Sequence, residues 1–174
     1  MAWIVKNSAG TQIERRDEPY LTQEIKEHFE ANIVTRYPSR RAASIPLLHA
    51  LQDKYNWLPP QALEEAAEFL GIQASELMDT ASFYEMFWLK PKGKYLIMVC
   101  QSISCELLGH EKLIEALEKK LGITVGQTTP DGKFTLIHGE CLGSCGTAPC
   151  ALLNDRLHEN LTVENLSAII DSCE

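Results

Sequence analysis

The spacing of apolar residues changes near residue 90, and this change constrains the fold more than any other feature of the sequence. Before that point, apolar residues recur at the period of amphipathic helices. Beyond it, short β-branched and aromatic runs alternate with helical patterns, as in α/β and α+β domains. Pro91-Lys92-Gly93 provides the turn residues of a hinge. The sequence therefore predicts a helical bundle over residues 1–90 and an α/β domain over residues 91–174.

The first half contains two predicted helices whose starts depend on capping residues and proline. The first carries an apolar residue at every fourth position: Leu21, Ile25, Phe29 and Ile33. Thr22 is its candidate N-cap. A second apolar face lies within residues 47–55, preceded by Pro46. Because proline is tolerated only in a first turn, Pro46 either kinks this helix or marks a start behind Ser44 as N-cap.

Two more helices are predicted before the hinge. Pro59-Pro60 begins a helix that Gly71 ends, and Ser75 is the candidate N-cap of the next. An aromatic run follows, made up of Phe83, Tyr84, Phe87 and Trp88. Packing in the core is the favoured interpretation of this run, and a partner surface is the alternative.

The second half is predicted to hold three strands and two helices in the order β-α-β-β-α. The strands are expected over Lys94–Cys100, Lys133–His138 and Cys150–Asn154, and the helices over Leu107–Leu121 and Thr162–Cys173. This order suggests a small sandwich of the thioredoxin type.

Charge and hydropathy exclude two classes of function. The formal net charge is −8 at pH 7, whereas nucleic-acid-binding proteins supply cations that displace condensed counterions, so DNA and RNA are not expected partners. The longest apolar run, Tyr95–Cys100, is far shorter than the roughly 20 residues that cross a bilayer, so no membrane span is expected. The N-terminal MAWIVKNSAG lacks a basic segment, which favours an intracellular protein. Its cysteines are then expected to bind metal or react rather than to form disulfides.

Four cysteines form two pairs whose spacing suits a metal centre. Cys100 and Cys105 enclose four residues, and Cys141 and Cys145 enclose three. Each pair follows a predicted strand, so each lies in a loop where backbone N–H groups can approach sulfur. Two thiolate pairs match the needs of a [2Fe-2S] cluster and equally those of a structural zinc. The predicted strands and helices provide a core without metal, which favours the cluster over a zinc-stabilised binding module.

The remaining candidates are assigned structural roles. Cys150 and Cys173 are predicted to be core residues, because cysteine is among the most buried residue types. His138 is expected to be structural, with hydrogen bonding to the cluster as the weaker interpretation. No G-x-G-x-x-G or P-loop motif occurs, so this chain is not expected to bind NADH. No catalytic residue is predicted, since no nucleophile with a base and an orienting group is recognisable.

Three stretches of the sequence resemble one known family. They are FYEMF at 83–87, KYLIMVCQSISCELLG at 94–109 and TPDGKFTLIHGECLGSCGTAPC at 129–150. They are similar to the E subunit of bacterial NADH:quinone oxidoreductase, respiratory complex I, and the similarity covers about residues 20–173. The resemblance implies a helical bundle followed by a thioredoxin-like ferredoxin domain. It also implies one [2Fe-2S] cluster, whose ligands are Cys100, Cys105, Cys141 and Cys145.

Partners and location also follow from the resemblance. It implies that the chain exchanges single electrons with FMN in the adjacent flavoprotein, the F subunit, which also binds NADH, and that the iron–sulfur G subunit is a further partner. The complex would lie at the inner, cytoplasmic face of the cell membrane. The diaphorase subunit of an NAD(P)-linked hydrogenase or formate dehydrogenase shares the motif and is the alternative. Residues 1–90 are expected to dock the flavoprotein, because a protein without a substrate pocket reaches its electron donor by docking.

Two positions depart from the family pattern. Asn56 replaces a residue that is commonly glycine, and Cys150 replaces one that is commonly apolar. Neither position belongs to the implied ligand set.

Overall fold

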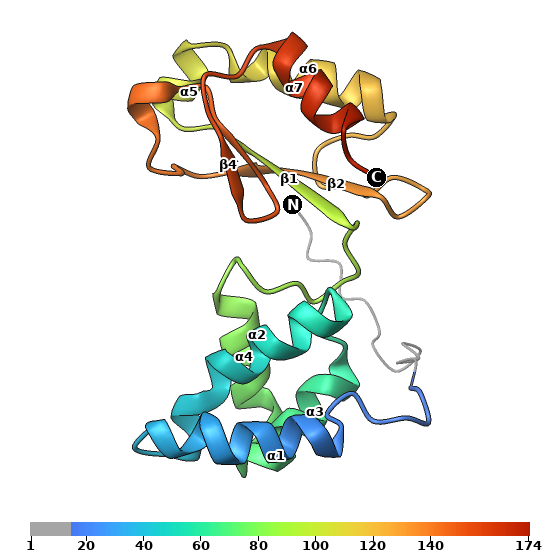
Figure 1. Cartoon of the computed structure of the whole chain (residues 1–174), viewed down its shortest axis with the longest axis vertical. Helices are drawn as coiled ribbons and strands as arrows, with labels where there is room; N and C mark the ends of the chain where they lie inside the picture. The colour runs from blue at the N-terminus through green and yellow to red at the C-terminus, as the bar shows by residue number, and fades with distance from the viewer. Residues whose placement is uncertain (1–14) are drawn as a thin grey trace, which may run out of the picture. The chain divides into compact units, whose positions relative to one another are not determined.

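The computed structural model describes residues 15–174, which divide into two compact units between Pro91 and Lys92 (Figure 1). The expectation about the N-terminal segment MAWIVKNSAG concerns residues outside this range. Among the described residues, no helix is both long enough and apolar enough to span a bilayer.

The first unit is built from helices around one leucine-rich core. The helices are α1 (Gln23–Asn32), α2 (Ser44–Tyr55), α3 (Pro60–Leu70) and α4 (Ala74–Phe83), with 3₁₀ turns at Val34–Arg36 and Arg40–Ala43. The largest fully buried side chains of this unit are Leu21, Leu47, Leu48, Leu51, Leu58, Leu63 and Leu77. They come from the helices and from the segments between them, so burial of apolar surface holds the bundle together.

Helix boundaries in this unit confirm some predictions and correct others. Thr22 caps α1, accepting a hydrogen bond from the Ile25 N–H, as predicted. Gly71 ends α3 with a φ of 70°, a conformation that glycine adopts without steric cost. Pro46 lies in the first turn of α2, so it marks the helix start rather than a kink.

Two predicted caps are wrong. The N-cap of α2 is Ala43, and the Ser44 hydroxyl donates instead to the carbonyl of Arg41 at 2.6 Å. The N-cap of α4 is Gln73 rather than Ser75. Gln73 forms a reciprocal capping box with Glu76, which satisfies the N–H groups that a serine cap would otherwise bind.

The aromatic run after α4 is only partly in the core. Phe87 is 7% exposed and packs in the helical core, but Phe83 is 79% exposed and Tyr84 is 36% exposed. The neighbouring Met86 is 50% exposed. The prediction of core packing is therefore wrong for Phe83, which leaves an apolar ring in water.

The second unit is a four-stranded mixed sheet with the strand order β2-β1-β3-β4. Its strands are β1 (Tyr95–Cys100), β2 (Phe134–Gly139), β3 (Ala151–Leu153) and β4 (Arg156–His158). β1 pairs in parallel with β2 and antiparallel with β3, and β3 pairs antiparallel with β4. α6 (His110–Leu121) and α7 (Val163–Asp171) lie side by side over the sheet (Figure 1). Their apolar residues form one core with Ile97, Val99 and Leu136.

Three features of this unit differ from the sequence prediction. The helix predicted over Leu107–Leu121 is α6 and begins only at His110, because Gly109 before it has a φ of 97°. The short helix α5 (Ile103–Leu107), which precedes it, is not among the predicted helices. The strand β4 has no counterpart among the predicted strands. It pairs with β3 across a turn at Asn154, whose φ of 52° is tolerated by asparagine.

Candidate metal centre

The sheet brings the two cysteine pairs to one edge. Cys100 is the last residue of β1, and it lies opposite Gly139, the last residue of the parallel strand β2. Cys141 follows only two residues later. Because parallel strands end at the same edge of a sheet, both cysteine loops leave the sheet at neighbouring points.

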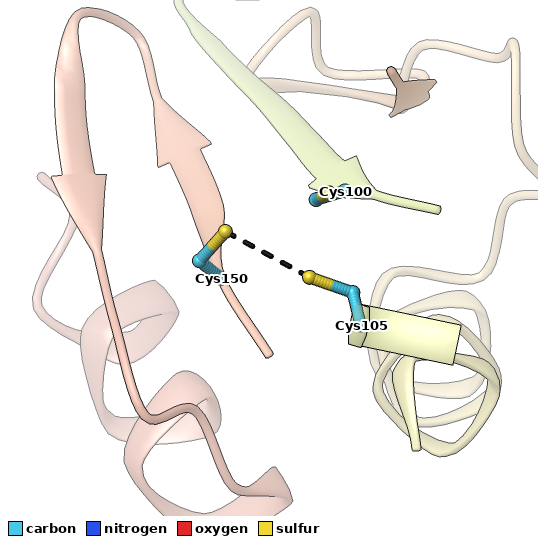
Figure 2. Close-up of side chains that lie close together, drawn as sticks. All are labelled: Cys100, Cys105 and Cys150. Atoms are coloured by element: carbon cyan, nitrogen blue, oxygen red, sulfur yellow. Dashed lines mark hydrogen bonds between the residues drawn. The ribbon is translucent and has the colours of Figure 1, made fainter. Parts of the chain in front are cut away.

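Three buried sulfurs form the inner part of the site. Cys100 is 2% exposed, Cys105 on α5 is 2% exposed, and Cys150 before β3 is 1% exposed. Their Sγ atoms all lie within 4.8 Å of one another, a spacing that could hold a metal ion. Figure 2 shows the side chains of Cys105 and Cys150 pointing toward each other, with 3.9 Å between their Sγ atoms.

The second predicted pair forms the outer part of the site. Cys141 and Cys145 are both exposed, and their Sγ atoms are 3.5 Å apart. The loop between them turns at Gly143, whose φ of 78° requires the left-handed region that favours glycine. This turn brings the two sulfurs close together without a regular helix.

Contacts between the two loops connect the inner and outer cysteines. The backbone N–H of Leu142, in the second loop, donates a hydrogen bond to the sulfur of Cys100. Burial alone would raise the pKa of Cys100, but this bond and one from the Ser102 N–H lower the pKa below its ordinary value. The Ser104 hydroxyl, in the first loop, in turn interacts with Cys145. These contacts place the two cysteine loops next to each other. The cysteines whose sulfurs all lie within 4.8 Å of one another are Cys100, Cys105 and Cys150, and this group does not include Cys141 or Cys145.

Three cysteines of the two loops and of the segment before β3, namely Cys105, Cys145 and Cys150, have pKa values above the ordinary value. The hydrogen bond and the charge of Cys141 raise the pKa of Cys145. Burial raises the pKa of Cys105, although the N–H and the thiol of Cys150 act in the opposite direction as donors to its sulfur. Burial, followed by the hydrogen bond and charge of Cys105, raises the pKa of Cys150 to about 12.

Cys150 belongs to this site, which sequence reasoning did not foresee. Cys150 is buried, as predicted, but it packs against the sulfurs of Cys100 and Cys105. It reaches them because Ala151, the next residue, pairs with Val99 in the antiparallel register between β3 and β1. No spacing in the sequence indicates this register, so no sequence signal could have placed Cys150 here.

A carboxylate fixes the outer loop. Glu159 accepts hydrogen bonds from the hydroxyls of Ser144 and Thr147, the latter at 2.5 Å. Cys145 lies between these two residues, in a 3₁₀ turn. The hydrogen bonds of Ser144 and Thr147 lower the pKa of Glu159, so the carboxylate holds this turn at neutral pH.

His138 points to the opposite face of the sheet from Cys100. It pairs with Val99, the neighbour of Cys100, and successive side chains of a strand point to opposite faces. Its ring lies 6.1 Å from that of His110, at the start of α6. The buried Nδ1 of His138 has no hydrogen-bond partner among the described residues, so the structural role of His138 stays a prediction.

The donor set fits an iron–sulfur cluster. Its candidate ligands are all cysteine sulfurs, the ligands that [2Fe-2S] clusters use. Backbone N–H groups of Ser102, Leu142 and Cys150 point at these sulfurs and would stabilise their negative charge in a bound cluster.

A comparison with known families decides the class of this protein. Residues 30–174 match the family described as thioredoxin-like [2Fe-2S] ferredoxin. The chain belongs to that family. Membership in the thioredoxin-like [2Fe-2S] ferredoxin family confirms the predicted fold class, α+β or α/β with a thioredoxin-like domain. It also identifies one [2Fe-2S] cluster as the cofactor.

Curated relatives of this thioredoxin-like [2Fe-2S] ferredoxin are named as subunits of NADH-quinone oxidoreductase, which confirms the resemblance noted in the sequence. The chain is 41% identical over 148 residues to the E 2 subunit of NADH-quinone oxidoreductase from Rhizobium meliloti, covering 85% of this chain and 88% of the relative. It is 41% identical over 148 residues to NADH-quinone oxidoreductase subunit 2 of Thermus thermophilus, covering 83% and 82%.

A solved structure is also similar to this thioredoxin-like [2Fe-2S] ferredoxin. The air-oxidized NAD+-reducing [NiFe]-hydrogenase superposes with a TM-score of 0.66 at 30% identity. The match covers 73% of this chain but only 22% of the hydrogenase chain. The likeness therefore concerns one part of that longer protein.

Proposed function

We propose that this chain is the [2Fe-2S] electron-transfer subunit of an NADH:quinone oxidoreductase, with Cys100, Cys105, Cys141 and Cys145 as the cluster ligands. One observation carries the proposal: Cys100 lies opposite Gly139 in the parallel ladder of β1 and β2, and Cys141 follows two residues after Gly139. The two cysteine pairs therefore lie at the same end of the sheet. The relatives named as subunits of NADH-quinone oxidoreductase supply the parent complex.

The stoichiometry of a [2Fe-2S] cluster supports this ligand set over one that includes Cys150, because each iron needs two protein sulfurs. Cys100 and Cys105 form an inner pair, and Cys141 and Cys145, 3.5 Å apart, form an outer pair. A ligand set with Cys150 in place of Cys141 or Cys145 would have three sulfurs in the inner part of the site and only one in the outer part.

The chain's own residues would prepare the site for electron transfer. When bound, a [2Fe-2S] cluster accepts and returns one electron at a time. The N–H groups of Ser102 and Leu142 stabilise negative charge on Cys100, and burial of Cys105 excludes water from the inner side. Glu159 holds the outer turn, so the ligands are held in place before the cluster binds.

NADH and FMN belong to the partner in this proposal. NADH delivers two electrons together as a hydride, whereas the cluster takes one, so a flavin is needed between them. The sequence has no phosphate-binding glycine motif. The expected partners are the FMN-containing flavoprotein, or F subunit, and the iron–sulfur G subunit, in the peripheral part of the complex at the cytoplasmic face of the cell membrane.

Exposed apolar side chains in both units suit docking to that partner. In the first unit, Phe83 and Met86 are exposed by 79% and 50%. In the second, Ile103 and Leu107 of α5 are exposed by 73% and 80%, next to the ligand Cys105. Large apolar side chains in water favour burial in an interface. We therefore assign residues 1–90 chiefly to partner docking and α5 to the contact beside the cluster.

A diaphorase subunit of an NAD(P)-linked hydrogenase or formate dehydrogenase is the second candidate. The similarity to the NAD+-reducing hydrogenase favours it, but identity is higher, at 41%, to the respiratory subunits, which also match in length. Copurification from the native cell separates the two parents: quinone reductase subunits support complex I, and hydrogenase or formate dehydrogenase subunits contradict it. A binding module stabilised by zinc on four cysteines is not supported, because the matched family carries [2Fe-2S].

Iron and sulfide analysis of cysteine variants tests the ligand set. Cys100→Ser, Cys105→Ser, Cys141→Ser and Cys145→Ser should each lose the cluster or change its visible and EPR spectra, because each removes one thiolate. Cys173→Ser is the matched control, since Cys173 lies at the end of α7, where its thiol donates to the Ile169 carbonyl. An unchanged cluster in any one of the four variants contradicts the proposal.

A further inference from the structure

Cys150 is a buried thiol that no ligand assignment uses. It is 1% exposed, and the side chains that pack around it include Cys100, Cys105, Leu142 and Ala148. Its Sγ lies 3.9 Å from that of Cys105, within hydrogen-bonding distance for sulfur. Its backbone carbonyl accepts a hydrogen bond from the Cys100 N–H at 3.1 Å, so the backbone also fixes its position.

The direction of the hydrogen bond follows from the chemistry of the two sulfurs. A cysteine that binds iron does so as a thiolate, which has no proton and can only accept hydrogen bonds. A neighbouring cysteine that is not a ligand keeps its proton in a buried site, because a second negative charge would lie beside the thiolates and away from water. Cys150 is then the donor and Cys105 the acceptor.

We propose that Cys150 is a protonated, non-ligating thiol that donates an S–H···S hydrogen bond to the Cys105 thiolate and thereby raises the reduction potential of the cluster. The inference rests on the ligand set proposed above.

The expected effect on the potential has a simple electrostatic cause. Reduction adds one negative charge to the cluster and its thiolates. A hydrogen-bond donor stabilises the more negative, reduced state more than the oxidised state, and the effect is large where water is excluded. Removing the donor should therefore make the cluster harder to reduce.

Redox titration of the full chain, loaded with iron and sulfide and followed by EPR, tests the inference. Two donor-free variants are used: Cys150→Ala, which is smaller than cysteine, and Cys150→Val, which fills the space. Both should retain the cluster and shift the midpoint potential to a more negative value. Cys173→Ala removes a thiol that lies just after the end of α7, and it should leave the midpoint potential of the cluster unchanged.

Three other outcomes of this titration would each refute at least one of the proposals. A potential that stays constant or rises in both Cys150 variants refutes the hydrogen bond and leaves the ligand set intact. Loss of the cluster from both variants, with the fold retained by circular dichroism, makes Cys150 a ligand and refutes the inference together with the ligand set. A wild-type chain that takes up no iron and sulfide refutes the proposed function itself.

Discussion

Cys100 lies directly opposite Gly139 in the parallel ladder between β1 and β2. This pairing places the ends of the two strands side by side and starts both cysteine loops from one edge of the sheet. Gly139 also leaves room for a neighbour, because a Cβ atom there would overlap the Met98 side chain at Cγ and lie 2.6 Å from its Sδ. A side chain at position 139 would therefore displace the side chain of Met98.

Gly139→Ala should lower the free energy of unfolding by about 1–3 kcal/mol, the usual cost of overpacking a filled site. Met98 would have to move, which would disturb the strand that ends at Cys100. Chemical denaturation of the cluster-free chain measures this effect. Gly146→Ala is the control, since no atom lies within 4 Å of a Cβ at that position. Equal stability of the two variants would contradict the prediction.

Glu159→Gln should weaken the outer cysteine loop at neutral pH but not in acid. The hydroxyls of Ser144 and Thr147 lower the pKa of Glu159 in the folded state below its ordinary value of 4.5. A depressed carboxyl pKa gives stability that is present above the unfolded pKa and lost as the pH falls through the folded pKa. The denaturation midpoints of wild type and variant should therefore differ at pH 7, approach each other as the pH falls below 4.5, and converge once the pH is below the folded pKa of Glu159.

The matched control for this pH series is Glu115→Gln, which changes an exposed carboxylate on α6. Its midpoint should follow the wild type throughout the series. A difference for Glu159→Gln that persists unchanged into acid would show that its carboxylate charge does not hold the turn.

The isolated chain should show neither saturable NADH binding nor reduction of its cluster by NADH. The expectation follows from the absence of a glycine-rich phosphate motif in the sequence and from the assignment of FMN to the partner. Isothermal titration calorimetry and the visible spectrum under anaerobic conditions measure the two quantities, and dithionite serves as the positive control for reduction. Saturable binding of NADH would place a nucleotide site on this chain.

Phe83→Ala should weaken association with the flavoprotein partner without changing the cluster. The ring is 79% exposed, so its removal costs little folding stability but removes an apolar anchor from the proposed interface. Coexpression with the partner, followed by copurification, measures the association. Tyr37→Ala removes another exposed aromatic ring of the same unit and is the control. Undiminished recovery of the partner with Phe83→Ala would exclude this ring from docking.

Many helices and strands of the fold can be predicted from the sequence because interactions between neighbouring residues determine them. Thr22 and Gly71 limit helices through capping and backbone geometry that depend on a few neighbouring residues. The run Tyr95–Cys100 is a strand in the structure, as its β-branched and aromatic residues predict. Where several residues compete for one local role, prediction is weaker: Gln73 caps α4 although Ser75 is the commoner capping type.

The sequence by itself determined that four cysteines occur in two closely spaced pairs and that each pair follows a strand in the chain. Both features depend only on the spacing of residues in the sequence and on the periodicity of strands, which are local properties. Only the tertiary structure decided that Leu142 contacts Cys100 and that Cys150 joins the buried sulfurs. Both contacts depend on the parallel register of β1 with β2 and the antiparallel register of β1 with β3. The alternation of apolar residues decides which face of each strand is buried, but which residues of two distant strands lie opposite each other is settled only when the strands pack into one core.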